Sequence, residues 1–172
     1  MMIATKLDSA HADADPAAFK LAMRHLLGAV SVITVGTGAE ITGFTATSVS
    51  SLSIEPATIL VSLNRSSSSW TALLEAQAFA VNILSADQSD IASRFAGIGG
   101  VKGNDRYLGS EWTRGVTGSR LLEGALSSID CTLEDAIERH SHAILIGRVR
   151  PVSVETKASP LGYFDGAFRT IS

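Results

Sequence analysis

The stretch GFTATSVSSLSIEPATILVSLNRSSSSW, residues 43–70, sets small hydroxyl residues on both sides of an apolar run. Within it, residues 57–64 (ATILVSLN) have the β-branched and apolar composition of a strand. Residues 45–48 (TATS) and 64–69 (NRSSSS) lie at the ends of predicted strands. The stretch therefore predicts β-structure whose connecting loops carry many hydrogen-bonding groups.

Further strands are predicted on both sides of this stretch. Segments 29–35, 40–46 and 79–84 are rich in Val, Ile, Thr or Phe and are bounded by turn residues. The last third of the chain predicts long strands in succession over residues 124–155 and a final strand over 161–171. The chain is therefore predicted to be mainly β.

Fewer helices are predicted. Asp15 can cap a helix, Pro16 suits its first turn, and apolar residues at helical spacing follow until Gly28. Segments 68–77 and 86–97 also carry helical spacing. Because the strands outnumber the helices and do not alternate strictly with them, we predict an antiparallel β-barrel with peripheral helices.

The composition limits the classes of partner. With 172 residues, 45% of them hydrophobic, the chain fits one domain with a substantial core. A net charge of −3 gives no general attraction for nucleic acid or anionic lipid, and no apolar run is long enough to span a bilayer. The lone Cys131 suits a reducing compartment. We expect a cytoplasmic protein with one domain over 15–172 and an N-terminal arm over 1–14 that is mobile or held by a partner.

Several familiar kinds of active site are absent from the sequence. No P-loop or GxSxG motif occurs, and the glycine cluster at 97–103 follows a predicted helix rather than a strand, against a dinucleotide fingerprint. The histidines include one close pair, His140 and His142, with no cysteine or spaced carboxylate beside it. We therefore predict no metal site.

The hydroxyl-rich loops remain as candidates for ligand binding. They can surround an anionic, polyhydroxylated ligand with neutral hydrogen bonds, while Arg65 supplies charge and the helix near Ser68 supplies free N–H groups. The alternative is that the Ser and Thr clusters are ordinary turns and helix caps. The residues themselves leave both interpretations open.

Several blocks of the sequence together resemble the short-chain flavin reductase family, from about Phe19 to Arg169. The blocks are FKLAMRHLLGAVSVITV, GFTATSVSSLSIEPATILVSLNRSSSSW, FAVNILSADQSDIASRFAG, DRYLGSEW and SHAILIGRV…PLGYFDGAFR. The resemblance implies the FMN-binding split β-barrel, a Greek-key antiparallel barrel assembled as a homodimer. It also implies reduction of FMN or FAD by NADH or NADPH, with reduced flavin diffusing to a separate partner monooxygenase.

The resemblance assigns roles to the hydroxyl-rich loops. It places residues 43–48 at the edge of the isoalloxazine and the ribityl chain, where small Ala46 allows close approach and neighbouring hydroxyls donate hydrogen bonds. The cofactor-binding candidates in this loop are Thr45, Ala46, Thr47 and Ser48. Those at the ribityl-phosphate end are Asn64, Arg65, Ser66, Ser67 and Ser68.

Two further elements match the family. Arg94 and Phe95 match an Arg-Phe pair, which implies that Arg94 faces phosphate and that Phe95 packs on the ligand or the barrel; helical spacing from Ile91 favours a core role for Phe95 equally. His142 matches the histidine of the family's Gly-Asp-His and is the candidate catalytic residue near flavin and nicotinamide. The Asp is replaced by Ser141, which is expected to loosen the imidazole or lower its basicity.

Other functions stay open on the sequence. One is a flavoprotein of the same fold that reduces a corrinoid or a metal complex. Another is a non-enzymatic barrel that binds flavin or haem. For His142 itself, the alternative is an exposed residue in a hairpin turn.

Overall fold

The computed structural model describes residues 13–155 and 158–171. The helices over these residues are α1 (Pro16–Met23), α2 (Ser68–Ala76) and α3 (Ser89–Phe95), with 3-10 turns η1 (Gly38–Glu40), η2 (Ala86–Gln88), η3 (Ile98–Gly100) and η4 (Gly103–Tyr107). The strands are β1 (Gly28–Ala29), β2 (Ser31–Val35), β3 (Thr42–Ala46), β4 (Val49–Ile54), β5 (Ala57–Asn64), β6 (Ala78–Ile83), β7 (Trp112–Arg114), β8 (Arg120–Leu122), β9 (Ser127–Arg139), β10 (His142–Val154), β11 (Leu161–Phe164) and β12 (Ala167–Thr170).

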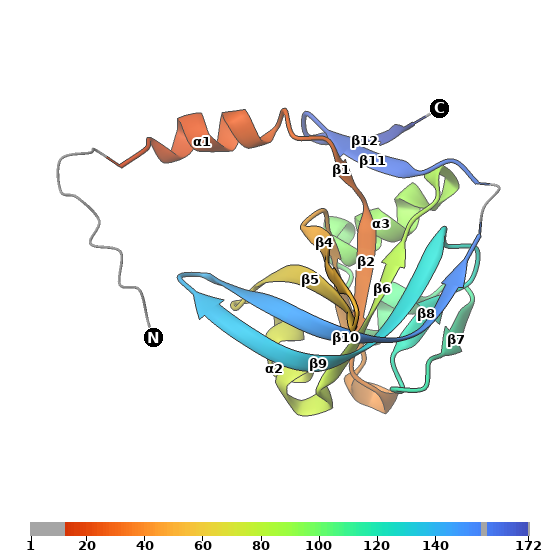
Figure 1. Cartoon of the computed structure of the whole chain (residues 1–172). Helices are drawn as coiled ribbons and strands as arrows, with labels where there is room; N and C mark the ends of the chain where they lie inside the picture. The colour runs from red at the N-terminus through yellow and green to blue at the C-terminus, as the bar shows by residue number, and fades with distance from the viewer. Residues whose placement is uncertain (1–12, 156–157, 172) are drawn as a thin grey trace, which may run out of the picture.

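A seven-stranded antiparallel sheet forms the body of the molecule, in the order β3-β2-β6-β9-β10-β5-β4 (Figure 1). Its two edge strands, β3 and β4, are joined in sequence by only Thr47 and Ser48. The two ends of the sheet must therefore meet at this link, so the sheet is rolled. The Ser62 amide donates to the Ser48 carbonyl at 3.3 Å and fixes the corner.

The rolled sheet is not closed by hydrogen bonds. Among the described strands no ladder joins β3 to β4. Side chains cover the β3 edge instead, because Tyr107 donates to the Thr42 carbonyl and Arg106 donates to the Gly43 carbonyl. Burial raises the pKa of the Tyr107 phenol well above its ordinary value and keeps it a donor. The predicted mainly β fold with antiparallel strands is confirmed, and its rolled sheet is not closed into a barrel among the described strands.

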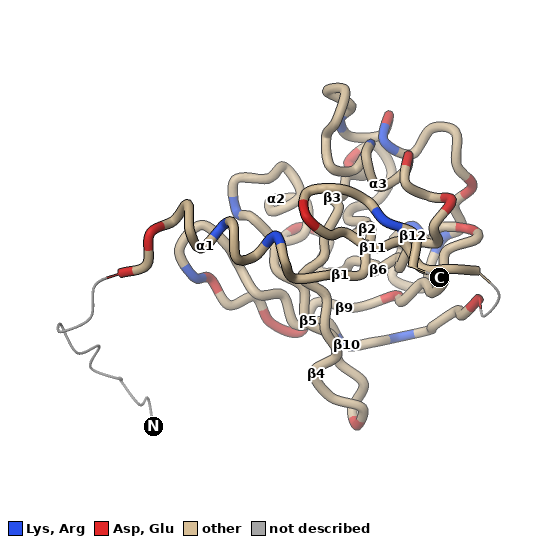
Figure 2. Tube along the Cα trace, turned by 90° about the horizontal axis from the view of Figure 1, so that it is seen from above, with Lys and Arg blue, Asp and Glu red and all other residues tan. Residues whose placement is uncertain are grey.

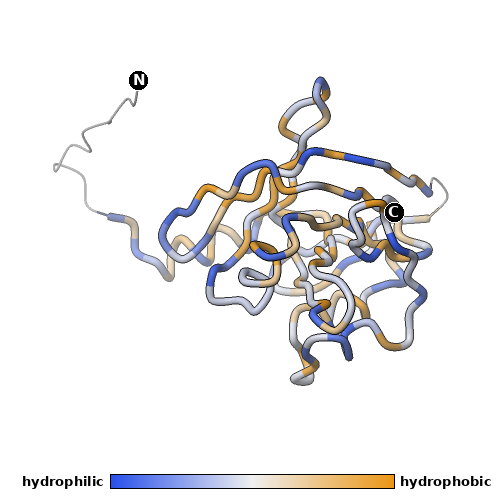
Figure 3. Tube along the Cα trace, turned by 90° about the horizontal axis from the view of Figure 1, so that it is seen from below, coloured by the Kyte–Doolittle hydropathy of each residue, from blue (hydrophilic) through white to orange (hydrophobic). Residues whose placement is uncertain are grey.

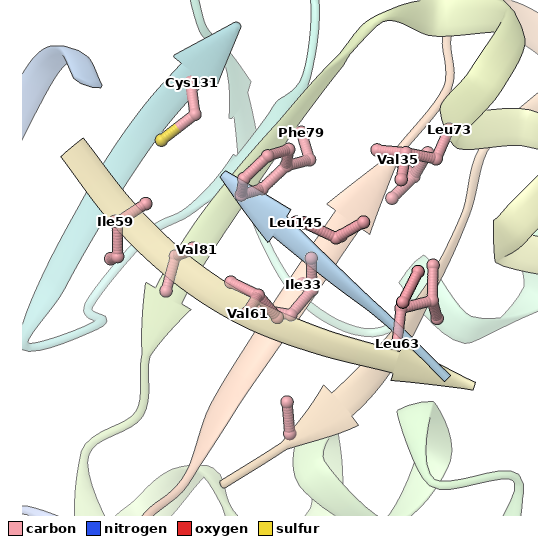
Figure 4. Close-up of a cluster of buried hydrophobic side chains, with 12 residues drawn as sticks. Ile33, Val35, Ile59, Val61, Leu63, Leu73, Phe79, Val81, Cys131 and Leu145 are labelled. Carbon is pink, nitrogen blue, oxygen red and sulfur yellow. The ribbon is translucent and has the colours of Figure 1, made fainter. Parts of the chain in front are cut away.

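The main core fills the inside of the roll. Figure 4 shows side chains from opposite sides of the sheet meeting there, among them Ile33, Val61, Phe79, Val81 and Leu145. Figure 3 shows hydrophobic positions recurring between hydrophilic ones along the trace of the chain. A second cluster, around Phe95, Tyr107 and Leu161, packs α3 and the β11–β12 hairpin on the other side of β2 and β3. Strand β2, which pairs with β3, therefore contributes side chains to both clusters.

Helix α1 differs from the prediction. Asp15 accepts from the Ala17 and Ala18 amides, as a cap should, but the helix ends at Met23 rather than near Gly28. The chain leaves the helix because the Arg24 carbonyl accepts from the Asp165 amide at 2.9 Å and β1 pairs with β11. No residue of α1 is buried. The helix stands clear above the sheet in Figure 1, and in Figure 2, seen from above, it crosses over other parts of the trace.

Most other elements match their predictions within a few residues. The predicted strand over 57–64 and helix over 68–77 are confirmed as β5 and α2. Strand β4 was not predicted, and the single strand expected over 161–171 is a hairpin of β11 and β12. Residues 1–12 of the predicted arm lie outside the described residues. In the described part of the chain no helix is long and apolar enough to cross a membrane.

Candidate functional site

A hollow with an aromatic wall lies on one side of the link between β3 and β4. We call it the aromatic compartment; its volume is about 530 Å³. Its floor is the strip Thr45, Ala46 and Thr47. The remaining lining comes from the α3 region and the β11–β12 hairpin, namely Ser93, Ala96, Ile98, Tyr163, Gly166, Ala167 and Phe168.

A second hollow, of about 390 Å³, lies on the other side of the same strip. We call it the hydroxyl compartment. It shares Thr45, Ala46 and Thr47 with the aromatic compartment. The rest of its lining is Phe44, Ser48, Ser62, Leu63, Asn64, Ser67 and His142. The two compartments are therefore neighbours along one strip of backbone.

Strand register brings distant parts of the sequence to the hydroxyl compartment. His142 on β10 is paired with Asn64 on β5. The Arg65 amide donates to the Ser141 carbonyl at 2.9 Å and extends this pairing beyond the strand end. The structure thus places the candidate catalytic histidine beside the 64–69 loop, as well as beside the 45–48 loop.

The hydroxyls of the 45–48 loop differ in the bonds that they already make. Thr45 Oγ1 donates to the Ala92 carbonyl at 2.6 Å, and Ser48 Oγ donates to the Ser62 carbonyl at 3.3 Å. A hydroxyl has one proton, so Thr45 and Ser48 can only accept from a ligand while these bonds persist. Of the loop hydroxyls, Thr47 is the one that makes no hydrogen bond to another described residue, so it can donate to a ligand without breaking a bond within the described part of the chain.

The 64–69 loop serves partly as a helix cap. Asn64 Oδ1 accepts from the Ser66 amide at 3.0 Å and from Ser66 Oγ at 2.9 Å, and Ser67 Oγ accepts from the Ser69 amide at 3.2 Å. Asn64 and Ser67 line the hydroxyl compartment, and Ser66 lies beside them in the loop. Ser68 lines a different hollow, with Thr42 and Lys102, so the structure does not bring it to the shared strip.

Arg65 is next to the hydroxyl compartment but does not line it. Its guanidinium forms an ion pair with Glu138, donates to the His140 carbonyl at 3.2 Å and lies 5.9 Å from the Trp70 ring centroid. The positive charge is therefore compensated within the protein. A phosphate would compete with Glu138 for it.

Arg94 and Phe95 serve the packing around α3. Arg94 donates to the Leu108 carbonyl and, at 2.7 Å, to Ser110 Oγ, and it lines neither compartment. Phe95 is buried against Tyr107 and Trp112, with ring centroids 5.0 and 5.7 Å apart. Of the two roles open to Phe95, the structure places it in the core.

His142 is exposed and borders the hydroxyl compartment. Its Nδ1 lies 2.9 Å from Ser141 Oγ. A hydroxyl thus stands where the family pattern has a carboxylate, and it still gives the imidazole a hydrogen-bond partner. His140, also exposed, occupies the turn with a positive φ of 51°.

The aromatic wall is the part of the site that the sequence did not reveal. Tyr163 and Phe168 face each other across the β11–β12 hairpin, with centroids 5.5 Å apart at 64°. Both occur in the block LGYFDGAFR, and the Asp-Gly turn between aromatic residues was a hairpin signal. Neither residue was assigned a role, because apolar residues in a strand equally indicate core.

The two compartments fit a flavin chemically. Each volume lies in the range of about 300–1,000 Å³ typical of small-molecule sites. Aromatic and small side chains suit a flat ring, and hydroxyl and amide groups suit a ribityl chain. Thr45, Ala46 and Thr47 border both compartments and so can contact both parts of one molecule.

Neither metal nor thiol chemistry has support among the described side chains. No cluster of three or more His, Cys, Asp or Glu residues is placed there to hold a metal ion. Cys131 is fully buried, and burial together with the charge of Asp130 raises the pKa of its thiol to about 12. The described groups around the shared strip can therefore bind and orient, but include no activated nucleophile.

Comparison with known proteins identifies the family. The model of the flavin reductase like domain matches residues 23–172. The chain is 35% identical over 158 residues to FMN reductase (NADH) RutF of Klebsiella variicola (strain At-22), which covers 92% of this chain and 95% of that protein. It is 31% identical over 157 residues to HsaB of Rhodococcus jostii (strain RHA1), the reductase subunit of a flavin-dependent monooxygenase, covering 91% and 78% respectively.

A solved structure agrees with these relatives. The NADH:FAD oxidoreductase SgcE6 of Streptomyces globisporus C-1027, in complex with NAD and FAD fragments, superposes with a TM-score of 0.83. The alignment has 26% sequence identity and covers 92% of this chain and 93% of that one. The predicted resemblance is confirmed, and the chain belongs to the flavin reductase-like domain family.

Proposed function

We propose that the chain transfers hydride from NADH to a flavin held across the two compartments and releases the reduced flavin to a partner monooxygenase. Family membership makes it an NAD(P)H:flavin oxidoreductase with flavin and NADH as reactants. The proposal adds the binding site, the preference for NADH and the partner. Its main support is the single strip, residues 45–47, that borders an aromatic and a hydroxyl-lined compartment.

The described residues have distinct parts in this proposal. Tyr163 and Phe168 hold the ring, while Asn64 and Ser67 face the ribityl-phosphate chain. A bound flavin supplies the ring that accepts hydride at N5. Thr47 donates a hydrogen bond to the ligand, and Thr45 accepts one.

His142 is proposed to orient the nicotinamide nucleotide. It is exposed at the edge of the hydroxyl compartment, beside the strip on which the flavin lies, and Ser141 holds its ring. An imidazole so placed acts by positioning, which suits a reaction whose chemistry belongs to the two nucleotides. No acid, base or nucleophile is required from the chain.

A homodimer and a cytoplasmic location complete the proposal. Exposed apolar side chains on and after α1 support the dimer, since Phe19, Leu21 and Leu26 are each at least 60% exposed. Leu52 and Ile54 on β4 are exposed as well. Light scattering should give about twice 18.0 kDa; a monomer that still reduces flavin would show that one chain suffices.

Steady-state oxidation of NADH with and without added FMN or FAD tests the proposed reaction. We expect oxidation that depends on flavin, and uptake near one flavin per chain in equilibrium dialysis. Flavin binding without NADH oxidation would favour a non-enzymatic flavin-binding protein. Oxidation that requires a corrinoid or a metal complex instead of free flavin would identify another acceptor.

A further inference from the structure

Arg24 contacts the turn of the β11–β12 hairpin, which carries the wall of the aromatic compartment. Arg24 Nε donates to Asp165 Oδ1 at 2.8 Å, and its Nη2 donates to the Asp165 carbonyl at 3.0 Å. The Asp165 amide in turn donates to the Arg24 carbonyl at 2.9 Å. These contacts join residues 141 positions apart. We call this set of contacts the Arg24 latch.

The latch acts on a turn that itself lines the compartment. Asp165 and Gly166 have positive φ angles of 48° and 80°, which is the geometry of a two-residue hairpin turn. A Cβ at Gly166 would lie 3.0 Å from Arg24 Nη2, so the guanidinium packs directly on the turn. Gly166 and the next residue, Ala167, line the aromatic compartment. Any movement of the turn therefore changes the compartment.

The residues that follow Arg24 contact both sides of the same compartment. Gly28 pairs with Tyr163 of the aromatic wall. On its other side, a Cβ at Gly28 would lie 2.8 Å from Thr47 Cβ, so its backbone is packed against the shared strip. The segment from Arg24 to Gly28 thus spans from the hairpin turn to the floor of the site.

We propose that Arg24 is a positioning residue of the flavin site, which sets the distance between the β11–β12 turn and the strip at Thr47. The inference rests on the proposed function. The Arg24–Asp165 ion pair is half exposed, so its contribution is small and sensitive to salt. Of the two compartments, the turn borders only the aromatic one. Loss of the ion pair should therefore weaken binding of the flavin ring.

The test compares Arg24→Ala with Arg148→Ala in flavin binding. The control removes a similar exposed ion pair, Arg148 with Glu134 at 2.7 Å, from strands β9 and β10, away from both compartments. Kd is measured by fluorescence for FMN and for riboflavin, which lacks the phosphate. Arg24→Ala should raise both Kd values by the same factor, about three- to tenfold, and Arg148→Ala should raise neither.

Two further variants keep the test decisive if Arg24→Ala is unstable. Arg24→Lys keeps the charge and should give an intermediate Kd, and Asp165→Asn keeps a residue that tolerates positive φ while removing the carboxylate. Unchanged riboflavin binding in Arg24→Ala and Asp165→Asn, or equal losses in Arg148→Ala, would overturn the latch while leaving the reductase intact. Failure of the wild-type protein to bind either flavin would overturn the proposed function and the latch together.

Discussion

The two compartments on either side of residues 45–47 are built from opposite chemistry. The aromatic compartment is walled by Tyr163 and Phe168 from a C-terminal hairpin, which is held in place by a second core. The hydroxyl compartment is lined mainly by short neutral polar side chains, with His142 at its edge. The difference indicates that one ligand is recognised in two ways. Its ring is recognised by shape, and its ribityl-phosphate part is recognised by hydrogen bonds.

The first prediction tests the difference between the compartments by filling one of them alone. Ala167→Trp places an indole in the aromatic compartment, from a strand that favours aromatic residues. We expect FMN affinity to fall by about a hundredfold or more, because the ring loses its space. Equilibrium dialysis measures the affinity.

The matched control is Thr170→Trp, an exposed position on the same strand that lines neither compartment. It should bind FMN like the wild type. If both tryptophan variants bind FMN normally, the ring does not occupy this hollow.

The second prediction separates binding from reaction. His142→Ala should leave the FMN Kd nearly unchanged and lower kcat/KM for NADH by about tenfold to a hundredfold, the value of one positioning contact. His140→Ala should do much less, although it lies in the same turn. Equal losses in the two variants, in stopped-flow or steady-state assays, would mean a general disturbance of the hairpin.

The third prediction compares two threonines of the shared strip. Thr47→Val removes a hydroxyl that is available to a ligand, and should raise the FMN Kd about three- to tenfold with little change in the thermal midpoint. Thr45→Val removes the bond to Ala92 and should lower the free energy of unfolding by about 1 kcal/mol. Thermal unfolding and flavin titration of both variants provide the check; the reverse pattern would contradict the assigned bonds.

The smallest expected effect concerns the charge near the hydroxyl compartment. Glu138→Gln frees Arg65 from its ion pair, and should tighten FMN about two- to threefold without changing riboflavin binding. The comparison of the two ligands isolates the phosphate. A tightening that is the same for both would place the phosphate away from Arg65.

The contrast between the polar and the aromatic compartment also explains how much of the site could be predicted from the sequence. Ser and Thr at the ends of predicted strands left a ligand site and ordinary turns both open, and the family resemblance then selected Thr47, Asn64 and Ser67, which the structure places at the hydroxyl compartment. Tyr163 and Phe168 could not be found in this way, because apolar residues in a strand have the same pattern whether they face a core or a ligand. Sequence reasoning finds the polar half of such a site more readily than the apolar half.

Other differences arise from tertiary contacts that no local pattern carries. Arg94 matches a family motif, yet its guanidinium donates hydrogen bonds to Leu108 and Ser110, in a loop more than a dozen residues further along the sequence. The early end of α1 also arises from a tertiary contact, because Gly28 pairs with Tyr163 of β11 and is therefore part of a strand. Strand β4 lacks a regular apolar alternation, and most of its residues are exposed at the edge of the sheet.

The most direct test of the two-compartment account uses lumiflavin, which is the flavin ring without its ribityl chain. Ser62→Trp fills the hydroxyl compartment from β5, whereas Ala167→Trp fills the aromatic one. We predict that Ser62→Trp loses FMN but still binds lumiflavin with the wild-type Kd, and that Ala167→Trp loses both ligands. Lumiflavin binding that survives in Ala167→Trp and disappears in Ser62→Trp would contradict the account, because it would place the ring in the hydroxyl compartment.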